Sequence, residues 1–553
     1  MKFMPMRNKP LRAIAEWISI VNDSGSAFYD RLNEIYGDNE AARTEAAKMC
    51  LRTLEEFSRI FGDDRPVMVI RSTGRVNLLG THIDHRGGAV NSVAIKQIWA
   101  VVQGRGDDRV LVKNIESEQF QDEEFCISQC LPNGKNIQDW EAWCCDEFEK
   151  RQGNKSITWS NYVRSAVLYF QHLNTADDGT FTAPLQGMNM MFYGNVPRAA
   201  GLSSSSSIVM LAAEAVMQLN GIEMTPIEVV EHCGYAEWYV GTRGGCGDHA
   251  AIKFGRLNKV SHIEAFPMSV QNVLFPSNYK IVLANSLVEA KKQAGARNIF
   301  NNRVAAYEFG LMMICKNFPQ YAVKLEHLHD VNCENLGIDE AQIYRMIKSL
   351  PISVNRSDIM GILPEQQEEI NHVFRSHDEP EEGYKIRQVC LYGVAECVRS
   401  GMAVASLQSG DMETFGQLIS KSHDGDRVTK LADGKRVPVD NCYFDERIDS
   451  LIDDLESAVP ERIEQARLWR QGGGYNVSIP ELDILVDIAL STDGVIGAGL
   501  VGAGMGGSIA IIVESKCVQQ LINNLAERYH LPRKLPIRAQ VASPVFGLGT
   551  ICL

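Results

Sequence analysis

The chain has 553 residues, of which 45% are hydrophobic and 22% are charged, so it is long enough for two or three domains with ordinary globular cores. Its 55 basic and 69 acidic residues give a formal net charge of −14. This excess of negative charge argues against a general binder of nucleic acids or anionic membranes, and it still allows a local phosphate site.

The 14 cysteines are scattered along the chain and form no repeated pair. Neither Cys126 and Cys130 nor the adjacent Cys144 and Cys145 have the spacing of a zinc site. No run of 18 apolar residues is present, and no hydrophobic leader follows Met1. We therefore expect a cytoplasmic protein with reduced thiols, and no membrane or nucleic-acid partner.

The first 65 residues carry apolar side chains at helical spacing, most regularly from Ala46 to Phe61. They hold no cluster of chemistry-bearing side chains, so we expect a helical N-terminal extension, residues 1–65, packed on the main body. A helix is expected to begin at Thr158, which would cap it. Strands are expected at residues 66–70, 90–101, 110–113 and 187–194.

The first of these strands leads into a glycine-punctuated loop, residues 74–88, which carries Arg75, two histidines and Asp84. Functional side chains often occupy such loops. Asp84 can accept hydrogen bonds from ligand hydroxyls, and Arg75 can stabilise a phosphate or a nearby carboxylate. A surface turn with solvated charges explains this loop equally well on its own.

The most informative stretch is residues 197–207, in which Gly201 and Leu202 precede five consecutive serines, Ser203 to Ser207. An apolar, helix-forming run follows at once. This order is typical of a loop that enters a helix N-terminus, where unpaired N–H groups and the helix dipole attract phosphate. The alternatives are a serine-rich linker and a plain N-cap, and a flexible linker is rarely followed directly by an apolar helix.

A third loop, residues 241–249, surrounds Asp248 with glycines. A carboxylate held by a tight backbone suits a general base, or a group that polarises an attacking hydroxyl. A turn aspartate is the alternative reading of the same pattern.

The C-terminal half predicts mostly helices. We expect a helix over residues 386–407 and an insertion at about 424–475, which is rich in Asp, Arg and Gly. A glycine-rich run, residues 493–508, precedes a strand and allows close backbone contact with a ligand or another loop. It lacks the strand-before, helix-after context of a dinucleotide fingerprint, so we expect no Rossmann site. The remaining expected elements are a strand at 279–284, a helix at 291–313, and short helices and loops over 330–380.

Three of these segments, in this order and spacing, resemble motifs of the GHMP kinases, most closely those of the galactokinase family. Residues 201–207 are similar to the phosphate-binding motif GLSSSAS, and residues 502–507 resemble the C-terminal motif G-[AG]-G-F-G-G. The loop at 74–88 resembles the galactokinase signature, with matches at Gly74-Arg75-Val76-Asn77-Leu78, Gly80, His82, Asp84, Gly87 and Gly88. Weaker matches lie at 159–163, 247–249, Arg303 and 477–483, and the resemblance covers about 66–423 and 475–553.

The fold that this resemblance implies is α/β (α+β), with two domains and the site between them. Residues 66–275 would form a ribosomal protein S5 domain 2-like N-terminal domain. Residues 276–553 would form a ferredoxin-like C-terminal domain that includes the insertion.

The resemblance implies transfer of the γ-phosphoryl group of ATP, with Mg²⁺, to the anomeric hydroxyl of a galactose-like sugar. Asp248 matches the carboxylate that acts as base or polariser, and Arg75 matches the arginine that stabilises the attacking oxygen and the phosphoryl group. Ser206 is implied as a hydroxyl ligand of Mg²⁺; ungapped counting places Ala236 at the acidic ligand, which leaves the neighbouring Glu237 as the candidate. Sugar contacts are implied at Thr81, His82, Asp84, Gly247 and Phe300. Nucleotide contacts are implied at Trp159, beside adenine, and at Gly201, Leu202, Ser203, Ser204, Ser205, Ser206 and Ser207.

Two positions depart from the galactokinase pattern. Thr81 stands where galactokinases have a Glu that hydrogen-bonds the C6 hydroxyl, and Phe300 stands where they have a sugar-contacting Tyr. The loss of a carboxylate removes a repulsion against an anionic C6 group, and Arg86 lies nearby in sequence. The loop also resembles the plant galacturonokinase branch. The substrate therefore stays open between galactose, galacturonate and another galacto-configured sugar.

A catalytically inactive sugar- and ATP-binding regulator is the alternative of another class, because the family includes transcriptional inducers. The retained Arg75, Asp248 and complete serine run favour an enzyme. A kinase of a non-sugar alcohol such as mevalonate is disfavoured by the sugar-type loop at residues 80–88. We expect small-molecule partners, and a monomer in preference to an oligomer.

Overall fold

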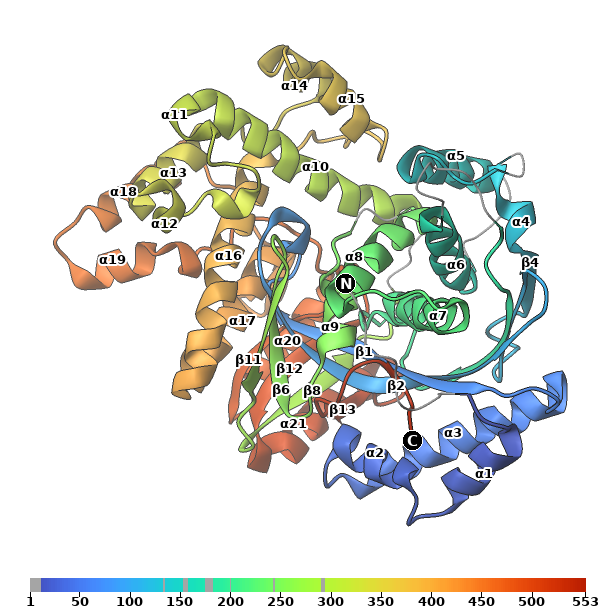
Figure 1. Ribbon diagram of the computed structural model, residues 1–553. Coiled ribbons are helices and arrows are strands. Elements are labelled where there is room, and N and C mark those ends of the chain that lie inside the picture. Colours follow the sequence, from blue (N-terminus) through green and yellow to red (C-terminus); the bar gives the residue numbers. More distant parts are fainter. Residues whose placement is uncertain are drawn as a thin grey trace.

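The structure is a computed structural model that describes residues 11–132, 135–152, 158–174, 183–198, 200–241, 244–289 and 294–553. Two antiparallel-rich sheets and more than twenty helices build it (Figure 1). None of the helices in these ranges is long and apolar enough to cross a bilayer.

Three N-terminal helices cover one face of the larger sheet (Figure 1). They bury Trp17 and Phe28 against Trp99 of the sheet, with all three side chains fully inaccessible. The helical extension expected within residues 1–65 is therefore present, while residues 1–10 lie outside the described residues. The helices are α1 (Ile14–Asn22), α2 (Ala27–Tyr36) and α3 (Glu40–Phe61).

The larger sheet has eight strands in the order β14-β1-β2-β5-β3-β4, with β6 paired to β2 and β7 paired to β6. Its pairings are antiparallel except for β3 with β5. The strands are β1 (Met68–Leu79), β2 (Val90–Gly104), β3 (Arg109–Asn114), β4 (Glu123–Cys126), β5 (Met188–Gly194), β6 (Lys259–Glu264), β7 (Ser269–Leu274) and β14 (Gly549–Thr550).

The prediction that residues 74–79 form a loop is wrong. β1 continues to Leu79, and Arg75 pairs with Ala94 of β2. All twelve residues of β1 are buried, because helices cover both faces of the sheet at this point, so the strand does not show the polar alternation of an exposed one. The glycine and arginine that resembled loop residues are instead part of a buried strand that is bulged between Ser72 and Gly74.

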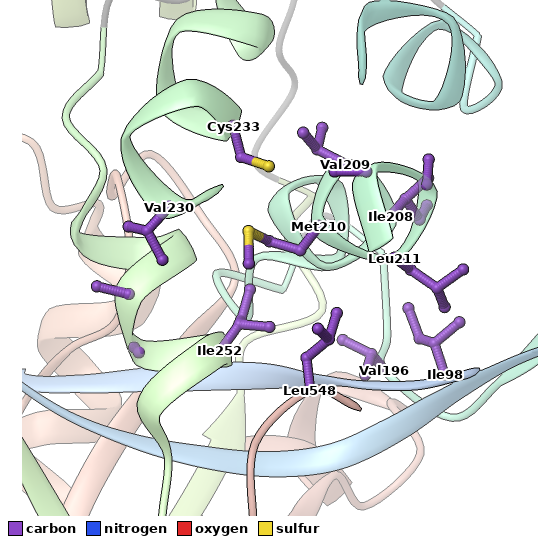
Figure 2. Close-up of a cluster of buried hydrophobic side chains, with 14 of the residues drawn as sticks. Ile98, Val196, Ile208, Val209, Met210, Leu211, Val230, Cys233, Ile252 and Leu548 are labelled. Atoms are coloured by element: carbon purple, nitrogen blue, oxygen red, sulfur yellow. The ribbon is translucent and has the colours of Figure 1, made fainter. Parts of the chain in front are cut away.

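Helix α7 packs on the other face of this sheet and is buried over most of its length. Figure 2 shows Leu211 facing Ile98 and Val196, while Met210 points towards Ile252 and Cys233. The apolar run after the serines thus forms the core that fixes the helix N-terminus in place. The helices on this face are α4 (Ile127–Cys130), α5 (Trp140–Gln152), α6 (Asn161–Leu173), α7 (Ser204–Asn220), α8 (Pro226–Ala236) and α9 (Gly247–Phe254). Thr158 lies outside α6, whose N-cap position is Ser160.

The second sheet has four antiparallel strands in the order β11-β12-β8-β13. They are β8 (Tyr279–Asn285), β11 (Val495–Leu500), β12 (Ser508–Glu514) and β13 (Ala539–Ala542). β11 was missed because its alternating Gly and Ala carry little strand signal. The exclusion of a Rossmann site stands, because a strand and not a helix follows the glycine-rich turn.

Helices predominate in the rest of the C-terminal half, with a small hairpin of β9 (Thr429–Ala432) and β10 (Lys435–Pro438). The long helix expected at 386–407 is α16, and the one expected at 291–313 is α10, whose first expected residues, 291–293, lie outside the described ones. The helices are α10 (Ala294–Asn317), α11 (Pro319–Ala322), α12 (Cys333–Leu336), α13 (Glu340–Lys348), α14 (Arg356–Ile362), α15 (Gln367–Phe374), α16 (Ile386–Ser409), α17 (Met412–Asp426), α18 (Asp445–Leu455), α19 (Pro460–Ala466), α20 (Pro480–Leu490) and α21 (Val518–Leu525).

A fully buried arginine, Arg71 of β1, ties distant parts of the chain together. Its Nε donates to the hydroxyl of Tyr36 at 2.7 Å, and its Nη1 donates to the carbonyl oxygens of Phe546 at 2.8 Å and Gly547 at 3.2 Å. Just beyond, β14 pairs with β1 at Ile70 and Arg71. The strand that carries Arg75 is therefore fastened both to the N-terminal helices and to the C-terminal residues.

Candidate active site

The serine-rich loop bends sharply where it enters α7. Ser203, the N-cap residue, has left-handed backbone angles of φ 52° and ψ 45°, and its side chain makes no capping hydrogen bond to the helix. Its hydroxyl donates instead to the Asp248 carboxylate. A non-glycine residue in this conformation is uncommon and indicates that the surrounding structure holds it there. The start of α7 therefore presents a hydroxyl to the third predicted loop.

Gly201 is required at the turn before it. Its φ is +79°, and a Cβ there would lie 2.3 Å from the carbonyl oxygen of Val501. In the facing glycine-rich loop, a Cβ on Gly502 would lie 2.9 Å from the Gly201 Cα, and one on Gly507 would lie 2.9 Å from the Ala200 carbonyl carbon. The glycines at 502 and 507 therefore allow close backbone contact with the serine-rich loop, which is one of the two roles expected from the sequence.

Arg75 and Asp248 form a two-pronged ion pair. Nε and Nη2 of Arg75 lie 2.6 Å and 2.7 Å from the two oxygens of Asp248, and Nη1 donates to the Gly201 carbonyl. Arg75 is 4% exposed, whereas the Asp248 side chain is 29% exposed. Asp248 lies in the first turn of α9 and not in a loop, because the apolar residues after it draw the chain into the core. Three residues far apart in sequence thus meet at the N-terminus of α7.

Ser206 and Glu237 come together beside this pair. Glu237 begins a short 3₁₀ turn (Glu237–Val240) after α8, and its Oε2 lies 2.9 Å from the Ser206 hydroxyl. Adjacent oxygen ligands of an octahedral Mg²⁺ at 2.0–2.1 Å lie about 2.9 Å apart, so the two oxygens fit this ion. Among the described residues no three His, Cys, Asp or Glu side chains form a metal site.

The five serines do not all face the site. The Ser207 hydroxyl contacts Ser72 of β1 at 2.8 Å, and Ser207 is fully buried, so this hydroxyl points into the sheet. Consecutive residues on a helix turn by about 100° each, so a run of five must place one against the sheet. Ser204 and Ser205 are half-buried in the first turn of α7, beside Ser203.

The loop that follows β1 lies against Asp248. The Asp84 carboxylate accepts from the backbone N–H of Gly247 at 3.2 Å and lies 3.3 Å from Nδ1 of His85. Burial alone would raise the pKa of Asp84, but these hydrogen bonds and the charge of His85 outweigh it and lower the pKa to about 2. A Cβ on Gly247 would lie 2.9 Å from this carboxylate, which explains the glycine there.

His82 turns inward from the same loop. Its backbone has a φ of 69°, its ring stacks on Tyr475 at 4.2 Å between centroids, and its Nε2 lies 3.6 Å from Oδ1 of Asp426. The side chains of His82 and Asp426 are only 2% and 1% exposed. These contacts give His82 the geometry of a residue that fastens the loop to the C-terminal half.

The other implied sugar contacts lie around this loop. Thr81 is buried, and its carbonyl accepts from the hydroxyl of Tyr392 at 3.3 Å. Phe300 of α10 lies 6.2 Å from the ring of His85. Arg86, the cation considered for an anionic sugar, forms an ion pair with Glu308.

Trp159 lies before α6, half-buried in an aromatic cluster. Its Nε1 donates to the carbonyl of Gln121 at 2.9 Å, and its ring meets Phe120 and Phe192 edge-on at 5.7 Å and 5.4 Å. Ala199, which precedes the serine run, and residues 242–243 of the loop before Asp248 lie outside the described residues.

Sequence reasoning missed a buried ion pair that supports the site. Oε1 of Glu396 in α16 accepts from the backbone N–H of Gly80 at 2.8 Å and from the Ser422 hydroxyl at 2.9 Å, while Oε2 contacts Nε of Arg399 at 2.7 Å. Both charged side chains are fully buried. Two opposite charges three residues apart inside an otherwise apolar helix were the available signal, because such charges are rarely buried unless paired.

The GHMP kinases N terminal domain family matches residues 161–256, the galactokinase galactose-binding signature matches residues 55–104, and the GHMP kinases C terminal family matches residues 452–531. The first match contains Asp248 and the serine run, and the second contains Arg75 and Asp84.

Galactokinases are among the relatives found. That of Clostridium beijerinckii is 25% identical over 477 residues, which cover 86% of this chain and 92% of the relative. That of Schizosaccharomyces pombe is 26% identical over 483 residues, covering 84% of this chain and 87% of the relative. The crystal structure of Lactococcus lactis galactokinase complexed with galactose aligns with 92% of this chain and 100% of its own at 21% identity, with a TM-score of 0.61, so the fold is shared. The mixed α/β fold with N- and C-terminal GHMP kinase domains is therefore confirmed, and the chain is similar to galactokinases over most of its length.

Proposed function

We propose that this protein is a sugar 1-kinase that transfers the γ-phosphoryl group of ATP to the anomeric hydroxyl of galactose. The observation that carries the proposal is the meeting of Arg75, Asp248 and Ser203 at the N-terminus of α7. The family and its galactokinase relatives supply the reaction class.

The phosphate end of the site is the start of α7. Its 17 residues align their peptide dipoles, and the unpaired N–H groups of the first turn, with the hydroxyls of Ser204 and Ser205, would hold the phosphates of ATP. Ser206 and Glu237 would hold Mg²⁺, which when bound neutralises phosphate charge during transfer. Trp159 would lie beside the adenine.

The sugar end is the Asp248 carboxylate. It is exposed enough to accept a hydrogen bond from the anomeric hydroxyl and thereby make that oxygen a better nucleophile. Arg75 offsets the negative charge of Asp248, so the carboxylate repels the approaching phosphates less, and its guanidinium can stabilise charge on the transferring group. Asp84 would accept from other sugar hydroxyls, and Gly247, Thr81 and Phe300 would line the pocket.

Galactose is favoured over galacturonate. A sugar carboxylate needs a cation to pair with, and the Arg86 guanidinium, the candidate from the sequence, is already paired with Glu308. Pairing a second carboxylate with Arg86 would place two negative charges beside each other. The buried Asp426 behind His82 adds further negative charge at this loop.

The test is a kinase assay with ATP on galactose, galacturonate, glucose and mevalonate, with detection of the sugar 1-phosphate. We expect the highest kcat/KM for galactose. Preference for galacturonate would overturn the substrate choice, and phosphorylation of mevalonate alone would overturn the reaction class. Binding of ATP and galactose without any phosphorylated product would support an inactive regulator instead.

A further inference from the structure

Two consecutive residues at the start of α9 face the first turn of α7. Asp248 accepts from Ser203, as described above. The next residue, His249, places Nε2 3.0 Å from Oε2 of Glu237, the same oxygen that lies 2.9 Å from the Ser206 hydroxyl. The first turn of α9 thus carries Asp248 and places His249 against Glu237.

His249 is almost completely buried, at 1% exposure, whereas the Glu237 side chain is 14% exposed. Within the described residues neither ring nitrogen of His249 makes a well-aligned hydrogen bond, so the contact to Glu237 is a close polar approach. A buried imidazole beside a carboxylate can restrain the orientation of that carboxylate.

The carboxylate of Glu237 needs such support. The residue lies at the junction of α8 and a 3₁₀ turn, and its side chain must hold one rotamer to present an oxygen to a cation. Groups behind a metal-binding carboxylate usually supply that restraint, and their loss weakens metal affinity. His249 approaches from α9, and Ser206 from α7, so Oε2 of Glu237 lies between contacts from two separate helices.

We propose that His249 is a positioning residue that orients Glu237 towards the divalent cation of the nucleotide complex. This rests on the proposed function, because it takes the nucleotide to be bound together with Mg²⁺. His249 acts through Glu237 and touches neither the sugar nor the phosphates in this account. A side chain with an N–H donor at the same place should serve equally well, and an apolar one should not.

The test compares the affinity of the protein for the ATP analogue AMP-PNP with Mg²⁺ and with EDTA, by calorimetry. The ratio of the two dissociation constants measures how strongly the metal is coupled to the nucleotide. His249→Leu should reduce this ratio by about 10- to 100-fold, and the affinity measured in EDTA should stay unchanged. His249→Gln should keep most of the ratio, because the Gln amide can donate to Glu237.

His262→Leu is the matched control. His262 is also buried, but its Nδ1 contacts the side-chain oxygen of Asn91 at 2.9 Å, on β6 and away from Glu237. The control should keep the wild-type ratio. A wild-type ratio from His249→Leu, an equal loss in His249→Gln, or a ratio near one in the wild type would each overturn the proposal. The titration needs no sugar turnover. A lack of sugar kinase activity would therefore overturn the proposed function, while the effect of His249 on metal-coupled nucleotide binding could still be measured.

Discussion

Replacing Asp248 with Asn would test the centre of the site. The change keeps the size of the side chain and removes its charge, so Arg75 loses a two-pronged partner and the sugar hydroxyl loses its strongest acceptor. The Asn amide can still accept one hydrogen bond from Arg75 or from Ser203. The effect on catalysis should therefore be much larger than the effect on folding.

The two magnitudes can be separated. Loss of a positioned base typically lowers a rate by about 10² to 10⁴-fold, or about 3–5 kcal/mol of activation free energy. The stability cost should be about 1–2 kcal/mol, because Arg75 keeps its bond to the Gly201 carbonyl and the Asp248 side chain, at 29% exposure, stays partly solvated. ATP affinity should change little, since the first turn of α7 is untouched.

The assay is kcat for galactose phosphorylation, with ATP-analogue affinity and urea unfolding measured on the same samples. Asp107→Asn is the matched control, because Asp107 forms an equally two-pronged pair with Arg105 at 2.6 Å and 2.9 Å in the exposed turn between β2 and β3. It should leave kcat unchanged. If Asp248→Asn kept more than a tenth of the wild-type kcat, the assignment of Asp248 as base or polariser would be refuted.

Three further changes test the frame of the site. Gly201→Ala should lower the melting temperature and weaken ATP binding, because the added Cβ would lie 2.3 Å from a backbone oxygen. Gly221→Ala is the control: Gly221 also has a positive φ but has open space around it, so the melting temperature should fall less. Equal melting temperatures of the two variants would contradict this account. Glu396→Gln should lower the free energy of unfolding by about 3–5 kcal/mol and raise the KM for sugar, because the substitution leaves the buried guanidinium of Arg399 without its counter-charge. An unchanged midpoint of urea denaturation would contradict this prediction. The pKa of Asp84 is about 2 in the folded protein against an ordinary 3.8, so its carboxylate should stabilise the fold by about 2 kcal/mol above about pH 4, and this stabilisation should be lost as the pH falls through 2. The free energies of unfolding in urea of the wild type and of Asp84→Asn should therefore converge at low pH. A constant difference between them at all pH values would argue against this account.

The parts of the site that could be predicted from the residues alone are those with local causes. The serine run before an apolar stretch specifies a helix start, and the structure has α7 beginning at Ser204. Helical periodicity, applied along the five serines, would also have predicted that Ser207 faces the sheet. The helical extension was equally clear, because apolar spacing is a property of neighbouring residues.

The other parts depend on partners far away in sequence. Arg75 and Asp248 are 173 positions apart, and only the family resemblance brought them together before the structure did. Strand β11 lacked a sequence signal because its glycines are selected by close approach to α17, where a Cβ on Gly497 would lie 2.3 Å from the Gly416 carbonyl oxygen. Glu396 serves Gly80, a backbone group that no side-chain pattern can reveal.

The pairing of β14 with β1 bears on modularity. The residues at 549–550 complete an edge of a sheet whose other strands all lie before residue 275, and the carbonyls at 546 and 547 solvate the charge of Arg71. A fragment ending at residue 275 would leave that guanidinium stranded in the interior and the edge of β1 open to aggregation. The N-terminal half therefore cannot be expressed as an autonomous module without the final segment of the chain.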